Sequence, residues 1–473
     1  MLSLSSCSRV RSCLPLLLLA ACATPSAPPE PLRPGPQARL QATGDARTLP
    51  EHEPAAAGPG AWWTAFGDPQ LDRLIDDARL KDLGLLAARR RLLAARALRP
   101  AAEAAYKPEL SLRSGAVATP DSRSGWVEQG FDARWELGLF GRDAASRALA
   151  QAELELAEAE FEQARLSLVA ELVRGWLEWR HELARHEQAR VTVLAEEHCL
   201  QQLQGRVDLG LLAASTLAPQ RQRLAAVREA EQQIARLLPL QRQRLQILRG
   251  EPRAELPEPA ALPRSAALPP APDSLPTAWL LEHPALRRAE QKLRQAAAQA
   301  GFAEAERWPR LALAANLGMA VPVLGRKAGD KPIPMLALGP LIDIPLFDAG
   351  RRDAAAVARR HELQAALLEQ HQVVRETQAE VEAALLRLQH SHERSEAAER
   401  ALLELDQQRQ AQARRAGIGL AAPLPEPGLE LARLEARQQW LGARLSQQLA
   451  YVALFKALGH PLPPAAPTPG AAG

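Results

Sequence analysis

The chain has 473 residues, of which 47% are hydrophobic and 24% are charged, a composition that can bury sizeable cores and argues against wholesale disorder. Lys and Arg total 58 against 55 Asp and Glu, so the net charge is +3, and removal of a leader containing Arg9 and Arg11 leaves about +1, which argues against an electrostatic nucleic-acid binder. Aromatic residues make up only 4%, while Ala, Leu, Glu, Gln and Arg dominate, a mixture typical of long exposed helices rather than of a β-sandwich or an α/β enzyme.

The N-terminal segment has the pattern of an export leader. Two arginines precede a run of eight apolar residues, 14–21, which is too short to span a bilayer. The run ends Leu19-Ala20-Ala21-Cys22, which resembles the lipobox of bacterial lipoproteins, where the cysteine sulfur takes the lipid. We expect residues 1–21 to be removed and Cys22 to carry a covalent lipid; the alternative is an ordinary signal peptide with a chance cysteine.

Proline-rich stretches divide the rest of the chain. Residues 22–60 are rich in Pro, Ala and Gly and are predicted to be an extended tether, and residues 251–276 are predicted to link two halves. The C-terminal tail, 459–473, has a similar composition. The two halves are therefore 61–250 and 277–458.

These halves form an internal repeat. A shift of 201 residues aligns apolar and small residues in the first part of each half, and a shift of 209 aligns the remainder. The matched residues include Leu85, Pro108 and Leu110 with Leu286, Pro309 and Leu311, and Gly141 and Gly210 with Gly350 and Gly419. The change of shift places a longer insertion in the second half, and the pattern indicates that one unit has been duplicated.

Each repeat is predicted to contain an unusually long helix, at about 142–208 and about 351–416, because proline is absent from both segments. Each helix would be roughly 100 Å long at 1.5 Å per residue. Apolar residues recur every seven residues among Glu, Gln and Arg, which is typical of coiled-coil faces. Shorter partner helices are expected at about 216–249 and 428–458, after turns containing glycine.

A β-hairpin is predicted before each long helix, at about 109–140 and about 310–346. Residues 127–139 alternate apolar and polar side chains, as a strand with one apolar face requires, although the second strand of the second hairpin alternates less cleanly. Strands of about ten residues can cross an outer membrane, but four strands cannot close a barrel, and an open sheet edge in lipid is costly. A spanning chain must therefore oligomerise: two copies give a filled eight-stranded barrel, and three give a twelve-stranded barrel wide enough for a channel.

The chain resembles TolC-like outer-membrane efflux factors of the lipoprotein (NodT-like) branch. The segments that carry the resemblance are Trp62-Trp63, Phe66-Gly67-Asp68-Pro69, Trp135-Glu136-Leu137, Leu139-Phe140-Gly141-Arg142, His283-Pro284 and Pro345-Leu346-Phe347-Asp348-Ala349-Gly350-Arg351. Asp68 and Pro69 are also expected to begin a helix as N-cap and first helical residue. The resemblance implies a mainly α fold with a membrane β-barrel portion: a homotrimer with a twelve-stranded barrel, four strands per chain, continued by a long α-helical barrel.

The same resemblance implies a location and partners. The chain would be a lipid-anchored protein of the bacterial outer membrane that extends into the periplasm. It would be the passive channel component of a tripartite efflux system, receiving substrates from the periplasm or from a pump. Its partners would be a periplasmic adaptor (membrane fusion) protein and an inner-membrane pump of RND type, in addition to outer-membrane lipid.

The predicted tips of the helical hairpins are the candidate gate or adaptor contact. The family usually narrows its periplasmic entrance with acidic residues near these tips. This chain departs from that pattern, because the first tip offers Asp208 while the second offers Arg414, Arg415 and, after several prolines, Glu426. An arginine ring paired with one of these acids would form a gate; the alternative is that the arginines are solvated or contact the adaptor.

Signals for an enzyme are weak, and we expect no catalytic residue, metal or cofactor other than the lipid on Cys22. The histidines of the long helices, among them His181 and His186, lack the spacing of a zinc site and are expected to be exposed helix residues. Cys199 is expected to be a passive helix residue. The remaining alternative function is a lipid-anchored periplasmic coiled-coil scaffold without a pore; the duplicated hairpin with one apolar face favours the channel.

Overall fold

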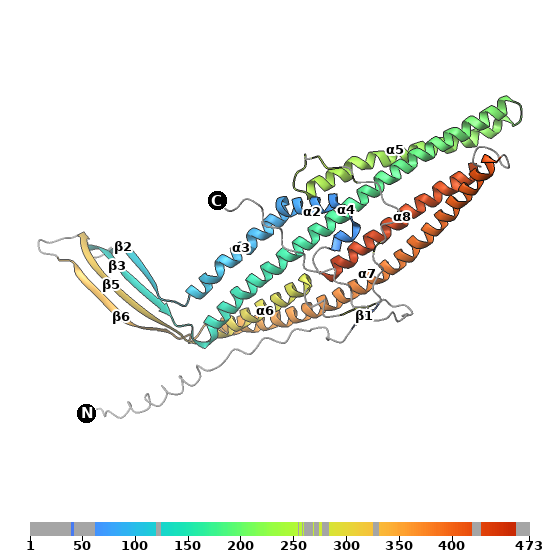
Figure 1. Cartoon of the computed structure of the whole chain (residues 1–473). Coiled ribbons are helices and arrows are strands. Elements are labelled where there is room, and N and C mark those ends of the chain that lie inside the picture. Colours follow the sequence, from blue (N-terminus) through green and yellow to red (C-terminus); the bar gives the residue numbers. More distant parts are fainter. Residues whose placement is uncertain are drawn as a thin grey trace, which may run out of the picture. The chain divides into compact units, whose positions relative to one another are not determined.

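The computed structural model describes residues 62–119, 124–253, 283–324, 331–418 and 427–459, with short pieces at 39–41, 255–257, 259, 268 and 274–276 (Figure 1). The elements in chain order are β1 (Arg39–Gln41), η2 (Trp62–Phe66), α2 (Pro69–Lys81), α3 (Leu83–Ala104), β2 (Glu109–Thr119), β3 (Ser124–Glu136), η3 (Leu139–Gly141), α4 (Arg142–Asp208), η4 (Ala214–Thr216), α5 (Leu217–Leu248), β4 (Ser274–Pro276), α6 (Pro284–Ala305), β5 (Arg310–Leu324), β6 (Ile333–Asp343), α7 (Arg351–Gly417) and α8 (Pro427–Leu458). The predicted leader and Cys22 lie outside the described residues.

The internal repeat appears in the elements residue by residue. Helices α3 and α6 each have 22 residues and are related by the shift of 201, while α4 and α7 each have 67 residues and are related by the shift of 209. Strand pairing follows the same shifts, because Glu109 lies opposite Arg134 in the first hairpin and Arg310 lies opposite Asp343 in the second. The extra eight residues are shared between a longer β5 and a longer β5–β6 connection.

The chain divides into two compact units that differ from the two repeats. The first compact unit contains Arg90–Ala159 and Arg287–Val373, and the second contains Glu160–Leu286 and Val374–Gly473 among its segments. Each unit therefore takes elements from both repeats.

The first compact unit holds a four-stranded antiparallel sheet with strand order β2-β3-β5-β6 (Figure 1). The central pair, β3 and β5, joins the two hairpins, with Val127 opposite Val321. Strands β2 and β6 form the edges, and neither has a second partner strand among the described residues. Three of the helices in this unit are linked by ion pairs at 3.1 Å, from Arg96 of α3 to Glu158 of α4 and from Arg294 of α6 to Glu155 of α4.

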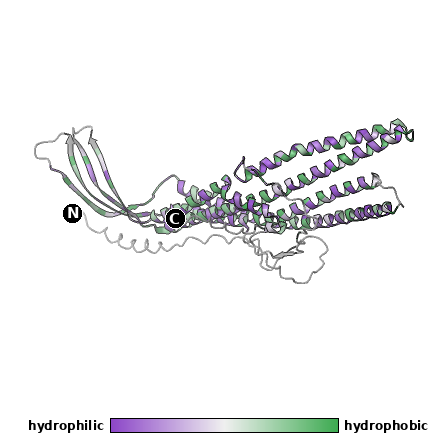
Figure 2. Ribbon diagram, turned by 45° about the horizontal axis from the view of Figure 1, so that its top comes forward, coloured by the Kyte–Doolittle hydropathy of each residue, from purple (hydrophilic) through white to green (hydrophobic). Residues whose placement is uncertain are grey.

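The second compact unit is built from paired antiparallel helices. Arg228 of α5 pairs with Glu197 of α4 at 2.6 Å, and Arg433 of α8 pairs with Asp406 of α7 at 3.3 Å. Buried residues of α7 recur every seven positions, as the coiled-coil pattern predicts: Val374, Val381, Leu388, Ser395 and Leu402. Polar residues cover the remaining faces, so apolar and polar residues alternate along the helices in Figure 2. None of the helices in the described ranges combines the length and apolar character needed to cross a membrane.

Candidate channel-forming sheet and helix tips

One face of the sheet is apolar and exposed. Side chains alternate along each strand, and the register places even-numbered residues of β2 and β6 on the same face as odd-numbered residues of β3 and β5. The large apolar residues of this face include Leu110, Leu112, Phe131, Trp135, Leu313, Leu317, Met319, Leu336, Leu338 and Ile342. Leu112 is 72% exposed and Leu338 is 81% exposed. Figure 2 shows hydrophobic residues along the strands. An exposed apolar face of this kind marks contact with lipid or protein.

The opposite face of the sheet is largely polar on β2 and β3, while on β5 it consists mainly of small residues around Asn316. Asp132 of β3 is its centre: its carboxylate lies 3.1 Å from the Arg113 guanidinium of β2 and accepts a hydrogen bond from the Asn316 side chain of β5. Glu128 and Arg134 share this face with Asp132 by alternation. The β6 strand departs from this pattern, because Met335, Leu341 and other apolar residues lie on its second face too, as its weaker alternation predicted. A sheet with one apolar face and one largely polar face suits the wall of a water-filled barrel.

A pair of glycines lets the two central strands approach closely. Gly130 of β3 lies opposite Gly318 of β5 on the polar face. A Cβ atom on Gly130 would lie 2.6 Å from the Gly318 Cα and 2.8 Å from the Leu317 oxygen, distances that side chains do not tolerate. Gly115, on the same face of β2, has no atom within 4 Å of its own Cβ position. The close approach therefore belongs to the central pair, and it permits the strong curvature that barrel walls require.

One guanidinium ties strands to helices where they meet. The largely buried Arg142 side chain lies 3.7 Å from Glu136 at the end of β3 and 3.7 Å from Glu306 after α6. Its guanidinium also lies 4.9 Å from the centre of the Phe302 ring, within range of a cation–π interaction. Glu306 in turn pairs with Arg310 at the start of β5, at 3.3 Å. These contacts fix the direction in which β3 and β5 leave the helices.

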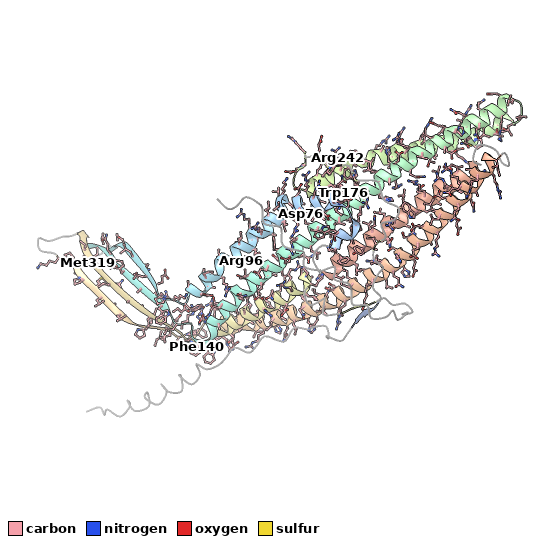
Figure 3. All side chains as sticks on the ribbon, in the orientation of Figure 1. Asp76, Arg96, Phe140, Trp176, Arg242 and Met319 are labelled. Atoms are coloured by element: carbon pink, nitrogen blue, oxygen red, sulfur yellow. The ribbon has the colours of Figure 1, made fainter. Side chains whose placement is uncertain are left out.

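Both repeats use the same strained turn before the long helix. Phe140 and Ala349 have left-handed backbone conformations, with φ of 57° and 55°, and each is followed by a glycine with positive φ. Non-glycine residues rarely adopt this region, so the turn is held by its surroundings. The Phe140 ring stacks on Trp308, with centroids 5.4 Å apart. Figure 3 places Phe140 at the helical end of the sheet and Met319 toward the other end.

The hairpin tips carry the predicted gate residues. Asp208 is the last residue of α4, and its carboxylate accepts a hydrogen bond from Gln204 at 2.9 Å. Gly210, with φ of 74°, follows it in a Schellman turn, where the amide of Leu211 donates to the carbonyl of residue 206. A carboxylate at a helix C-terminus opposes the helix dipole, so helix stability does not explain Asp208.

The tip arginines lie at the end of the second long helix. Arg414 and Arg415 are exposed in the last turn of α7, where their charge stabilises the helix C-terminus. Among the described residues, no ion pair joins either arginine to Asp208. Glu426 lies outside the described residues, as does Cys22. The structure thus locates three of the candidate residues at helix ends and brings none of them together within one chain.

Residues 74–251 and 275–460 each match the family described as "Outer membrane efflux protein". The chain belongs to this family. It is the outer-membrane channel component of a tripartite export system, and its family is not enzymatic.

Similar relatives and solved structures cover most of the chain. The efflux protein is 28% identical over 94% of its length to the pyoverdine export outer membrane protein OpmQ of Pseudomonas putida, covering 96% of that protein. It is 30% identical to OpmQ of Pseudomonas aeruginosa, over 76% of this chain and 77% of that one. The outer-membrane channel OprN matches with a TM-score of 0.77 and 26% identity, over 92% of this chain and 99% of its own. The open-state MtrE channel of Neisseria gonorrhoeae, 22% identical, has the same fold with a TM-score of 0.76, over 92% of this chain and 98% of its own.

Asp68 anchors the second compact unit of the efflux protein. As the sequence predicts, it is the N-cap of α2: one carboxylate oxygen accepts from the backbone amides of Gln70 at 3.0 Å and Leu71 at 3.4 Å. The other oxygen accepts from the Trp176 indole at 2.8 Å and from Arg180 at 3.1 Å. Burial lowers the pKa of the Arg180 guanidinium, and Asp68 opposes that shift. Sequence reasoning missed this second role, although Trp176 and Arg180 lie one turn apart on one face of α4.

Buried histidines correct one expectation about the efflux protein. His181 was expected to be exposed, but it is buried within the second compact unit, and burial lowers its pKa to about 4. His283 is also buried, with a pKa lowered to about 4, and its Nδ1 accepts from the backbone amide of Ala285 at 3.1 Å. His283 therefore caps α6 with Pro284 in the first helical position, which gives a physical role to the His283-Pro284 pair. Within the described residues, no cluster of three or more His, Cys, Asp or Glu could hold a metal ion.

Proposed function

We propose that three copies of this chain close a twelve-stranded barrel in the outer membrane. The observation that carries the proposal is the sheet itself, which has an exposed apolar face and two edge strands, β2 and β6, each open on one side. Open edges are prohibitively costly in lipid, so copies must pair edge to edge. Two copies would give eight strands and a filled interior, whereas Arg113, Asp132 and Asn316 on the inner face call for water. Three copies provide that space.

The paired helices would continue this barrel into the periplasm. Three copies of α4, α5, α7 and α8 supply twelve long helices, and the ion pairs between α4 and α5 and between α7 and α8 hold each antiparallel pair together. A coiled-coil scaffold without a pore would explain the helices. It would not explain a sheet with one apolar and one polar face, so the channel is the better account.

The chain is proposed to be anchored by a lipid on Cys22, supported by the Leu19-Ala20-Ala21-Cys22 sequence. Cys22→Ser should abolish incorporation of labelled palmitate while leaving the chain able to fold. A mutant that still takes up the label would show that the lipobox interpretation is wrong.

We assign a periplasmic adaptor and an inner-membrane pump of RND type as the partners. Relatives are named for export of pyoverdine and of toluene, compounds with very different chemistry. A passive tunnel transmits according to width and charge, so the pump would select the substrate. The tip residues Asp208, Arg414, Arg415 and Glu426 are proposed to gate the entrance or to contact the adaptor.

Native mass spectrometry of the full chain in detergent tests the assembly. The expected result is a complex of three chains with no stable smaller species at working concentration. A stable monomer or dimer extracted from the membrane would reject the twelve-stranded barrel.

A further inference from the structure

The two open edges of the sheet contain enough information to fix how neighbouring copies pair. Resting on the proposed trimer, we propose that β6 of one copy pairs antiparallel with β2 of the next copy in a single register, with Asp343 opposite Arg113 of the next copy. The phase of the backbone hydrogen bonds limits the possible registers, the internal repeat selects one of them, and the charges at the edges agree with it.

The hydrogen-bond phase decides which residues can face each other. The Leu137 amide donates to the Leu311 carbonyl at 3.0 Å, so odd-numbered residues of β3 and β5 bond to one another. Backbone groups point alternately to the two sides of a strand. Odd-numbered residues of β2 and β6 therefore bond inside the sheet, and even-numbered residues have free amide and carbonyl groups at both open edges.

Two further observations agree with this phase. Pro334 and Pro340, which lack an amide donor, both fall among the even-numbered residues of β6, as expected where the donor would face an open edge. Even-numbered residues of β2 and β6 also carry the apolar face of the sheet. Pairing even with even keeps that face continuous from copy to copy, and a slip of one residue is excluded because it would break both patterns.

The internal repeat then selects one register from those that remain. A shift of 201 relates β2 to β5 and a shift of 209 relates β3 to β6, and with these shifts the residue pairs of β2–β3 match those of β5–β6. The β3–β5 interface joins the first repeat to the second, so its equivalent in a closed ring joins β6 to β2 of the next copy. To find the equivalent pairs, each β3 residue is moved forward by 209 and each β5 residue back by 201. The Leu137–Leu311 pair then becomes Leu346 opposite Leu110, and Arg134 opposite Ala314 becomes Asp343 opposite Arg113.

The charges at the edges support this register. Asp343 and Arg113 have opposite charges, and opposite charges directly across a strand pair are favourable. Arg113 pairs with Asp132 in its own chain, at 3.1 Å, while Asp343 has no ion pair among the described residues. Slipping the register by two residues in either direction would place Asp343 opposite Ser111 or Gly115, and neither offers a charge.

The register also explains the exposed segment that follows β6. Residues 344–347 have no strand partner among the residues that the structure describes, and Leu346 is 89% exposed. In the proposed register Leu346 lies beside Leu110 and Ile344 beside Leu112, so four exposed apolar side chains form cross-strand pairs on the lipid face. Pro345 is compatible with this pairing, because its missing amide would point away from the neighbouring copy. The assembled β6 would then match the length of β3.

Disulfide cross-linking of the full chain in the outer membrane tests the register. The background carries Cys199→Ala, and the test variant adds Arg113→Cys and Asp343→Cys. These positions form a non-hydrogen-bonded pair, whose short Cα separation of about 4.5 Å suits a disulfide. Two control variants combine Arg113→Cys with Leu341→Cys and Gly115→Cys with Asp343→Cys, which represent the two-residue slips on the same face.

The expected result is a reductant-sensitive ladder of covalent dimers and trimers that is several-fold stronger for the test variant than for either control. An equal or stronger ladder from a control, or no ladder from any variant although native mass spectrometry shows a trimer, would overturn the register and leave the trimer standing. Absence of any trimer in the unsubstituted chain would instead reject the proposed function.

A charge exchange provides the second measurement. Asp343→Arg alone and Arg113→Asp alone should each lower the temperature at which the trimer dissociates in detergent. Arg113→Asp also loses the contact with Asp132 of its own chain, and this loss is the same with or without the change at position 343. The double variant should therefore be more stable than Arg113→Asp alone, and a double variant that is no more stable would count against the Asp343–Arg113 pair.

Discussion

Replacing Asp68 with alanine should destabilise the second compact unit severely. The carboxylate has two roles, since it caps α2 and pairs with the Arg180 side chain, which is only 8% exposed. Loss of an N-cap costs about 1 kcal/mol, and removing one partner of a buried ion pair costs about 3–5 kcal/mol because the remaining charge is left buried. The two effects share one residue and are not additive, so we expect a loss of about 4 kcal/mol in the free energy of unfolding.

Two variants make this prediction specific. Asp68→Asn keeps a good N-cap but loses the charge, so it should recover only about 1 kcal/mol relative to alanine. Asp76→Ala removes an exposed carboxylate from the same helix, one whose nearest guanidinium nitrogen lies 3.9 Å away, and should cost about 0.5 kcal/mol or less. Figure 3 labels Asp76 on this helix and Trp176, the indole partner of Asp68.

The assay is a guanidinium titration of the detergent-solubilised protein, followed by the circular dichroism of its helices. The guanidinium concentration at the midpoint of unfolding should be highest for Asp76→Ala, much lower for Asp68→Asn and lowest for Asp68→Ala. If Asp68→Ala behaves like Asp76→Ala, the buried pair does not anchor this unit and the reasoning is refuted.

Three further changes test other parts of the account. Burial lowers the folded-state pKa of His283 from 6.5 to about 4, so between these pH values the unfolded chain binds a proton that the folded chain does not, and the free energy of unfolding should fall as the pH drops from 6.5 to 4. His283→Asn can still cap α6 but does not titrate, so it should make the free energy of unfolding, measured by denaturant titration, depend less steeply on pH. An unchanged dependence on pH would contradict this role. Gly130→Ala should lower the temperature at which the trimer dissociates, because its Cβ meets the backbone of the facing strand. Gly115→Ala, whose added Cβ meets no atom of its own chain, should have a smaller effect. Equal effects would show that the close approach is unimportant. Arg414→Ala with Arg415→Ala should raise single-channel conductance without loss of trimers, and unchanged conductance with lost adaptor binding would assign these arginines to docking instead.

Periodic features of this fold could be predicted from sequence. The absence of proline and the sevenfold spacing indicate the long helices, and the glycine turn at Gly210 marks where α4 ends. Alternation from Val127 onward indicates a strand with one apolar face. These patterns are local, because each is produced by one element presenting one face to its surroundings. The duplication adds a second, independent reading of every element, which is why two shifts reproduce the strand pairing of the second hairpin.

Non-local features could not be predicted in the same way. Local alternation shows that β3 has an apolar face but not that it lies beside β5 rather than at an edge, since that depends on how the two hairpins meet. The same limit applies to His181, whose polar neighbours in sequence suggested exposure although packing against other helices buries it. Asp68 could be recognised as an N-cap from the proline that follows it, whereas its contacts with Trp176 and Arg180 join segments more than 100 residues apart.

The candidate gate residues show a further limit of prediction from sequence. Asp208 and Arg414 could be placed at hairpin tips from glycine and proline positions alone, and the structure locates them at the ends of α4 and α7. No ion pair joins them among the described residues of one chain, so pairing between tips of neighbouring copies stays a prediction.

Ion conductance of the purified protein in planar lipid bilayers tests the central claim most directly. The account predicts discrete and long-lived conductance steps from the unmodified protein, of one unit size, because each trimer encloses one water-filled barrel. A protein that binds the bilayer but passes no current, under conditions where native mass spectrometry finds the complex intact, would contradict the channel and favour a lipid-anchored scaffold.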